Sequence, residues 1–209
     1  MSPLDVRLAR VLVRPLRHTP LTPNGLTTLG LLASLVAAWL MASGDPRRAG
    51  LGGGLFMLAV LVDHMDGEFA RLTGLTSRVG HYYDHVAAGL GYVSLFVGLG
   101  IGLQSGWLGS WAPLAGGIAA GSIAAIFLIR VFLEEMAGRA MVAQENWRGF
   151  EPEDALYLVG PVAWLGLLVP FLLAAAVGTP LFLFWVVWCA VTRRSATASA
   201  ARGPAQRAG

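Results

Sequence analysis

Six apolar runs, separated by short polar stretches, make up most of the chain. A helix that crosses a bilayer needs about 20 mostly apolar residues, and apolar runs of that length predict membrane spans. The pattern therefore predicts an all-α integral membrane protein with six transmembrane helices. The predicted spans are 26–43, 51–72, 79–104, 112–136, 155–177 and 180–193.

The N-terminal segment before these runs has a different pattern. Arginines recur at intervals of three and four among leucines and valines, which gathers the charges on one face of a helix. A basic amphipathic helix of this kind is typical of a segment that lies on an anionic membrane surface. We therefore predict an interfacial helix over residues 1–20, ended by Pro20 and Pro23.

The arginines also predict the orientation in the membrane. All 15 basic residues are arginine, and twelve of them fall in the N-terminal segment, the loops after the second and fourth spans, and the tail, whereas Arg47 and Arg48 lie on the other side. Because cytoplasmic loops carry the excess of positive charge, both termini are expected in the cytoplasm. The tail over 195–209 is rich in Ala, Ser, Gly and Arg, which predicts a disordered segment after a single membrane domain over 1–194.

Composition narrows the class of protein. Hydrophobic residues make up 56% of the chain and charged residues 13%, which is about half the charged share of a soluble domain and excludes a soluble enzyme. The single cysteine, Cys189, excludes an internal disulfide, and a net charge of +3 is too small to indicate nucleic-acid binding. The Arg-only, Ala- and Gly-rich usage is typical of a prokaryote with GC-rich DNA, so we expect a prokaryotic inner (cytoplasmic) membrane.

Three carboxylates interrupt the second and third predicted spans. Asp63 and Asp66 lie three residues apart and therefore share one face of a helix, and Asp84 lies near the start of the next span. The two spans are joined by a short turn and must run antiparallel, which brings Asp84 close to the other two. A carboxylate inside a span costs about 3 kcal/mol, which indicates that these residues have a function.

Such a cluster predicts a site for a divalent cation. Three carboxylates in a low-dielectric region repel one another unless a cation lies between them, and hard oxygen ligands favour Mg²⁺ or Mn²⁺. Gly67 and Ala70 leave space beside the helix for a flat group such as a nucleobase, and the planar fork of Arg71 is suited to phosphate oxygens. The cluster therefore predicts chemistry on a phosphate or diphosphate at the cytoplasmic membrane face.

The same residues resemble the motif of a known family. The CDP-alcohol phosphotransferase (CDP-alcohol phosphatidyltransferase) family carries D-x2-D-G-x2-A-R-x8-G-x3-D-x3-D, and seven of these eight positions match here at every spacing. The matching residues are Asp63, Asp66, Gly67, Ala70, Arg71, Gly80 and Asp84. The stretch T-P-N-G-L-T, from Thr22 to Thr27, is similar to the family's T-P-N-x-[IL]-T segment, so the resemblance covers nearly the whole chain.

The resemblance implies a function in phospholipid biosynthesis. Members transfer a phosphatidyl-type group from a CDP-linked donor, commonly CDP-diacylglycerol, to the hydroxyl of an acceptor alcohol, and they release CMP. It implies two Mg²⁺ or Mn²⁺ ions and a homodimer. The residues that the resemblance assigns to the metals are Asp63, Asp66 and Asp84, and those that it assigns to the nucleotide are Asn24, Gly67, Ala70, Arg71 and Gly80.

The sequence departs from the motif at the fourth aspartate, which is Ala88. A methyl group neither ligates a metal nor takes a proton, so the second metal and the general base need another explanation. His85, one turn before Ala88 on the same face, is the first candidate base because histidine ordinarily titrates near neutral pH, and His81 is the second. Alternatively, the acceptor brings its own base, the chain is a catalytically silent relative that binds CDP-lipid and divalent metal, or the alanine is a substitution that traps a substrate complex.

Three arginines are candidates for binding the phosphate of a phosphorylated acceptor, since the chain has no lysine. Arg130 lies within the fourth predicted span, and Arg139 and Arg148 lie in the cytoplasmic loop that follows. Arg130 also has the spacing of an intrahelical ion pair with Glu134, four residues later.

Two other pairs have more than one interpretation. His81 and His85 have a spacing that can bind zinc on one helix, although an interfacial histidine pair is commoner. The spacing of Gly117 and Gly121 indicates a close helix contact, either inside the chain or between subunits.

Overall fold

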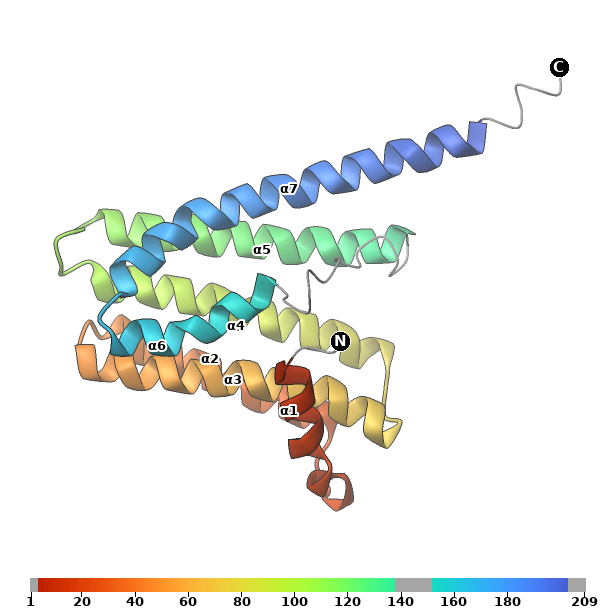
Figure 1. Cartoon of the computed structure of the whole chain (residues 1–209), viewed down its shortest axis with the longest axis horizontal. Coiled ribbons are helices and arrows are strands. Elements are labelled where there is room, and N and C mark those ends of the chain that lie inside the picture. The colour runs from red at the N-terminus through yellow and green to blue at the C-terminus, as the bar shows by residue number, and fades with distance from the viewer. Residues whose placement is uncertain (1–3, 138–151, 203–209) are drawn as a thin grey trace.

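The computed structural model describes residues 4–137 and 152–202, and nearly all of these residues are helical. Figure 1 shows long helices packed side by side, with a short N-terminal helix on one flank and a long C-terminal helix on the opposite side. The helices are α1 (Leu4–Val13), α2 (Pro23–Ala42), α3 (Pro46–Thr73), α4 (Arg78–Leu103), α5 (Trp111–Ala137), α6 (Val159–Trp164) and α7 (Leu168–Arg202), with short 3-10 helices at Pro15–His18 and Pro152–Leu158.

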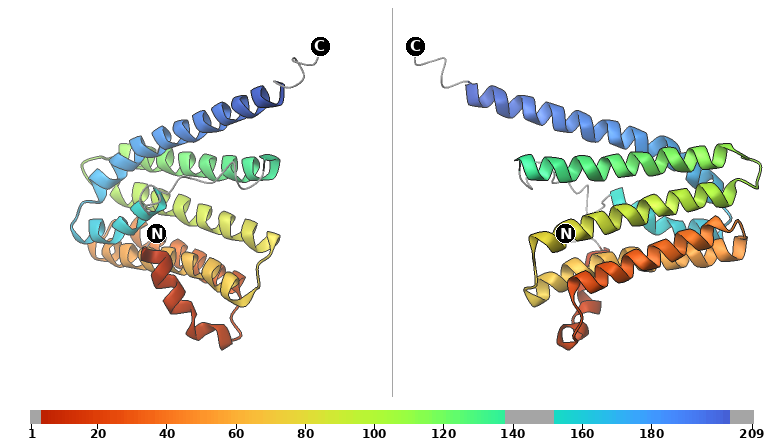
Figure 2. Two further views of the ribbon diagram at one scale, coloured as in Figure 1. Left: turned by 45° about the vertical axis from the view of Figure 1, so that its right-hand side comes forward. Right: turned by 180° about the vertical axis from the view of Figure 1, so that it is seen from behind.

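The predicted class, an all-α integral membrane protein, is confirmed. Within the described residues, five helices are long and apolar enough to cross a membrane. These segments are Pro23–Ala42, Pro46–Thr73, Arg78–Leu103, Trp111–Met136 and Leu168–Thr192. Helix α2 begins and α7 ends at the same end of the bundle, opposite the turns that join α2 to α3 and α4 to α5 (Figures 1 and 2).

The last two of the six predicted spans differ from the structure. The predicted break at Gly178–Thr179 is wrong, because α7 runs through both residues and through Pro180. An open turn in the bilayer would leave several backbone groups without partners, whereas an internal proline removes one hydrogen bond. The chain turns instead at Gly166, whose φ of 71° lies in the left-handed region.

The segment before that turn is too short for a full span. The apolar helix Ala155–Trp164 rises only about 15 Å, half of the bilayer's hydrocarbon thickness. The predicted span over 155–177 is thus divided between this short helix, which packs on α3, and the start of α7. Beyond its apolar part, Leu168–Thr192, α7 continues to Arg202 because its Ala-rich sequence favours helix. It therefore extends into the tail that the sequence predicted to be disordered; residues 203–209 lie outside the described part.

One side of the N-terminal helix α1 packs on the bundle, and apolar residues on its other side are exposed. Val13 is fully buried in a small core with Leu26 of α2 and Phe69 of α3. Leu8 and Val11 are exposed on the other side of the helix. This arrangement is compatible with the predicted interfacial helix, because exposed apolar side chains can enter the lipid while the buried ones hold the helix to α2 and α3.

Glycines set the distance between the packed helices. A methyl group added at Gly98 or Gly102 of α4 would clash with the backbone carbonyls of Ala38 and Met41 on α2. Gly116 of α5 lies equally close to α4, whereas a methyl group at Gly117 or Gly121 meets nothing within 4 Å. Within the described residues, then, the predicted Gly117–Gly121 contact is not internal to the chain.

This packing predicts that Gly102→Ala destabilises the protein. The new methyl group must push the Met41 carbonyl away, and overpacking of this kind costs about 1–3 kcal/mol. The apparent melting temperature in detergent should fall by about 2–4 °C per kcal/mol for a chain of this size. Gly178→Ala is the matched control, because the added methyl group there meets nothing within 4 Å; equal melting temperatures for the two variants would contradict the prediction.

Candidate metal and nucleotide site

The turn between α3 and α4 determines which residues face one another. Helix α3 ends at Gly74, whose φ of 72° allows the chain to leave the helix at once. Ser77 then caps α4 by accepting a hydrogen bond of 2.9 Å from the N–H of Gly80. The short connection sets α3 and α4 antiparallel, as the sequence predicts (Figure 2), and α2 packs against both of them.

The three predicted metal ligands meet at this end of the bundle. One carboxylate oxygen from each of Asp63, Asp66 and Asp84 lies within 4.8 Å of the other two. Asp66 is only 3% exposed, and it accepts a hydrogen bond from the hydroxyl of Thr27 on α2. Three carboxylates this close, one of them buried, form a donor set that fits a hard divalent cation.

A cavity of about 170 Å³ opens beside these carboxylates. Asp66 and Asp84 line it, and so do all five residues that the resemblance assigned to the nucleotide. Those five are Asn24, Gly67, Ala70, Arg71 and Gly80. The first turns of α2 and α4 both border the cavity, and helix N-termini attract anions such as phosphate. The structure therefore brings these predicted residues together on one surface.

A buried glutamate orients the arginine at this cavity. Glu68 accepts hydrogen bonds from Arg71 at 2.9 Å and from Arg10 of α1 at 3.1 Å, and its own side chain is only 8% exposed. The hydrogen bond to Glu68 raises the pKa of Arg10 above its ordinary value. The Arg71 guanidinium lies against Gly67, where an added methyl group would be 3.4 Å from it, an ordinary contact distance. Glu68 thus joins α1 to the edge of the cavity.

Sequence reasoning missed three contributors to this arrangement. Thr27 was quoted only as part of a motif, and nothing local shows that its hydroxyl reaches Asp66 on another helix. The contact of Arg10 with Glu68 joins residues 58 positions apart. The signal for Glu68 was its place, an acidic residue inside a predicted span, which favours a paired group.

Gly80 makes one of the closest contacts at the cavity, and this contact gives a prediction. A methyl group there would lie 2.9 Å from the Ser77 hydroxyl and 3.1 Å from the Asn24 side-chain oxygen. Gly80→Ala should therefore displace Asn24 and weaken CDP binding about tenfold, equivalent to about 1.4 kcal/mol. Equilibrium dialysis of CDP measures this effect, with the exposed Gly178→Ala as the control. Unchanged affinity in Gly80→Ala would show that this wall of the cavity does not contact the nucleotide.

The histidines lie on the side of α4 that faces α5. His81 Nε2 lies 2.9 Å from both carboxylate oxygens of Glu134, and His85 Nδ1 lies 3.8 Å from Asp84. His81 also lines the aspartate cavity, whereas His85, the first candidate base, is not among the residues that line it. Ala88 is partly buried and packs against the main hydrophobic core.

Of the three candidate acceptor-phosphate arginines, only Arg130 lies in the described part of the chain, and it does not line this cavity. Arg130 lines a separate, mainly apolar cavity of about 300 Å³ between α4, α5 and α7. Arg139 and Arg148 lie outside the described residues. Glu134, the predicted intrahelical partner of Arg130, forms the contact with His81.

Fold and site together define a class of protein: a helical integral membrane protein whose cavity at one end of the bundle is lined by carboxylates, an arginine and two helix N-termini. The model of the CDP-alcohol phosphatidyltransferase family matches residues 20–191. The chain belongs to this family.

Individual relatives support this assignment. The chain is 29% identical to archaetidylinositol phosphate synthase of Pyrococcus horikoshii over 96 residues. This aligned stretch is 46% of this chain and half the length of that protein. Two crystal structures of phosphatidylinositol phosphate synthase (PgsA1) of Mycobacterium tuberculosis share the fold, with a TM-score of 0.61 and 24% identity over 88% of this chain. The match covers 94% of the PgsA1 chain with CDP-DAG bound and 89% of the chain in complex with manganese and citrate.

Proposed function

We propose that this protein transfers a phosphatidyl-type group from a CDP-linked donor, such as CDP-diacylglycerol, to the hydroxyl of an acceptor alcohol in phospholipid biosynthesis. The observation that carries the proposal is the position of the three aspartates beside a cavity lined by Asn24, Gly67, Ala70, Arg71 and Gly80. In the reaction the acceptor oxygen forms a bond to the phosphorus that carries the lipid, the bond from that phosphorus to CMP breaks, and the acceptor hydroxyl loses its proton.

The groups that line the cavity offer hydrogen-bond donors and space for a CDP-linked substrate. The backbone N–H groups at the starts of α2 and α4, together with Arg71, supply donors for a diphosphate. Gly67 and Gly80 leave space for the nucleotide close to the helix backbones. That PgsA1 has been seen with CDP-DAG bound supports the choice of donor.

Asp63, Asp66 and Asp84 would hold the metal, either Mg²⁺ or Mn²⁺, and the manganese complex of PgsA1 supports this choice. A bound divalent cation supplies charge neutralisation at the diphosphate. Thr27 fixes the Asp66 carboxylate by its hydrogen bond. The family resemblance implies a second ion. We propose that it binds in the same aspartate cluster, although Ala88 supplies no ligand there.

The proton and the acceptor involve residues around this cluster. His85 remains a proposed base, and His81 is the second candidate, supported by its place in the cavity lining and its contact with Glu134. Arg130, Arg139 and Arg148 remain the proposed ligands of an acceptor phosphate. Both named relatives are synthases of inositol-phosphate lipids, so inositol phosphate is the first acceptor to test.

We further propose that the aspartate end of the bundle faces the cytoplasm of a prokaryotic cell, with both termini on that side of the inner membrane. The excess of arginine near this end supports the orientation. We also propose a homodimer. The outward-facing Gly117 and Gly121 support it, because small residues allow helices of two subunits to approach closely.

Ala88 favours one alternative function, a relative that binds CDP-lipid and divalent metal without turnover. Detergent-purified protein incubated with CDP-diacylglycerol, Mn²⁺ and a panel of alcohols separates the two. CMP release that requires both an acceptor and Asp63 supports the transferase. Tight CDP binding without CMP release supports the silent relative, and absence of both outcomes contradicts the proposed site.

A further inference from the structure

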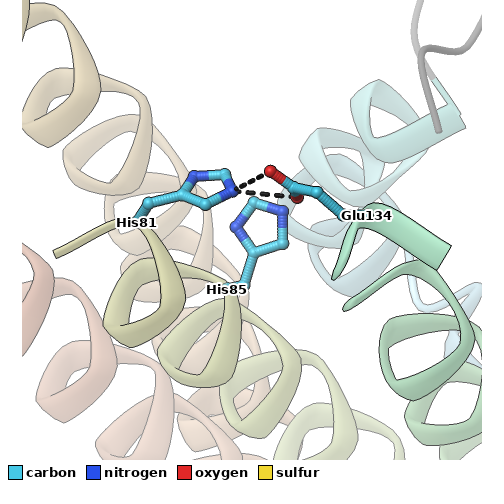
Figure 3. Close-up of side chains that lie close together, drawn as sticks. All are labelled: His81, His85 and Glu134. Atoms are coloured by element: carbon cyan, nitrogen blue, oxygen red, sulfur yellow. Dashed lines mark hydrogen bonds and ion pairs between the residues drawn. The ribbon is translucent and has the colours of Figure 1, made fainter. Parts of the chain in front are cut away.

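A second group of metal-ligating side chains lies beside the aspartate cluster. His81 and His85 lie one turn apart on α4, and Glu134 reaches toward them from α5 (Figure 3). One ligand atom from each of these residues lies within 4.8 Å of the other two. The two clusters are adjacent, because His85 follows Asp84 directly in the chain.

We propose that His81, His85 and Glu134 form a separate binding site for a zinc-type divalent cation. Two imidazole nitrogens and one carboxylate oxygen are a three-ligand set that suits Zn²⁺ and leaves its fourth position open. Mg²⁺ prefers oxygen ligands, so the site differs in metal preference from the three aspartates. The proposal does not depend on the reaction assigned to the aspartate site. It replaces the proposed role of His81 and His85 as the base, because an imidazole that binds an ion is not available to take the acceptor's proton.

The distances are close to those that such an ion requires. Ligand atoms about 2.0–2.1 Å from a tetrahedral ion lie about 3.3–3.4 Å apart. His81 Nε2 already lies 2.9 Å from the Glu134 carboxylate oxygens. The rings of His81 and His85 have their centroids 4.4 Å apart and are tilted by 57°, so the two imidazoles are not stacked. Small side-chain rotations suffice to place all three ligand atoms around one ion.

The second nitrogen of His85 also has a suitable neighbour. Its Nδ1 lies 3.8 Å from Asp84 Oδ2, and one ring nitrogen of His85 points toward Glu134 (Figure 3). A metal-ligating histidine usually directs its other ring N–H to a carboxylate or carbonyl, which fixes the tautomer and the ring orientation. Asp84 would therefore serve both clusters, as a ligand in one and as an orienting group in the other.

An ion at this position would join α4 to α5 next to the cavity. The side chains of His81, His85 and Glu134 are 25%, 28% and 12% exposed, so an ion can enter while much of the ligand set is shielded from water. Because His81 also lines the aspartate cavity, an ion bound by these three residues would lie next to that cavity.

Cobalt binding tests the site independently of catalysis, because four-coordinate Co²⁺ absorbs visible light. The full chain, purified without a polyhistidine tag and stripped with chelator, should develop the visible absorption of four-coordinate Co²⁺. This absorption should saturate at one equivalent for the His81–His85–Glu134 site, and Zn²⁺, but not a large excess of Mg²⁺, should remove it. The near-isosteric variants His81→Gln, His85→Gln and Glu134→Gln should each weaken binding by more than the ~10–100-fold typical of an outer-shell group. His18→Gln, a histidine outside the cluster, and Asp66→Asn should leave it unchanged.

Several results would overturn the site. These are no Co²⁺ absorption, equal affinity in the three ligand variants, or a loss caused by Asp66→Asn and not by the histidine variants. Should a ligand variant fail to fold, X-ray absorption at the zinc edge of the unmodified protein decides the question. Two imidazoles in the zinc shell support the site, and a shell of oxygen atoms alone contradicts it.

Discussion

Replacing Asp66 with asparagine is expected to reduce CMP release by at least ~10²–10³-fold, the effect of removing one preorganised charge-stabilising group. Asp66 is almost fully buried, and its carboxylate lies within reach of those of Asp63 and Asp84. Asparagine keeps the shape and can still accept the hydrogen bond from Thr27, so the loss falls on cation binding rather than on packing. Initial rates of CMP release from CDP-diacylglycerol, measured across a Mn²⁺ titration, test this.

Glu135→Gln is the matched control for that experiment. Glu135 is an exposed residue of α5, and the change removes one negative charge just as Asp66→Asn does. Its rate and Mn²⁺ dependence should match those of the unmodified protein. If Asp66→Asn kept more than a tenth of the activity while eluting as a folded protein, the aspartate cluster would not be the metal centre of the reaction.

The aspartate cluster could be predicted from the sequence, because each step of the prediction depends on local structure. The spacing of Asp63 and Asp66 places both on one face of any α-helix, and a short connection that includes Gly74 and Ser77 forces the next helix to run antiparallel. No long-range contact had to be known. The family resemblance assigned Gly67 and Gly80 to the nucleotide, and the structure has both at the cavity.

The contacts that the sequence did not predict join distant parts of the chain. Thr27 lies 39 residues from Asp66, and Arg10 lies 58 residues from Glu68. Many polar residues are equally plausible partners in a list of sequence positions, and only the packing of α1 and α2 on α3 selects these two. The error at Gly178 has a different origin. Turn-forming residue types predict a break in water, whereas the lipid environment favours an unbroken helix.

For the two histidines, the sequence predicted the local arrangement but not the long-range contact. Their spacing of four residues correctly placed His81 and His85 on one face of α4, but the sequence suggested that this face continues toward the aspartates. The structure turns it toward α5, where Glu134 meets it. Of the two histidines, only His81 lines the cavity, so the candidate base that the sequence ranked second is the one that the structure brings to the cavity.

Ala88→Asp is expected to raise CMP release by about 10²–10⁴-fold, the usual contribution of a positioned general base. Residue 88 lies one helical turn after Asp84, so a carboxylate there would lie next to the aspartate cluster and could accept the acceptor's proton or bind a second cation. The affinity for CDP should stay the same, because Ala88 does not line the cavity. The assay is the initial rate of CMP release with the acceptor that supports turnover.

Ala88→Asn separates the carboxylate from the space that it occupies. Its side chain is as large as that of aspartate and enters the same partly buried position, where Ala88 packs against the core, but it cannot act as a base. A gain with aspartate and none with asparagine would show that the natural chain turns over slowly for want of this group. No gain with aspartate, combined with a loss of activity in His81→Gln or His85→Gln, would contradict this expectation and place the proton on the histidines, because a second base adds little where one already acts.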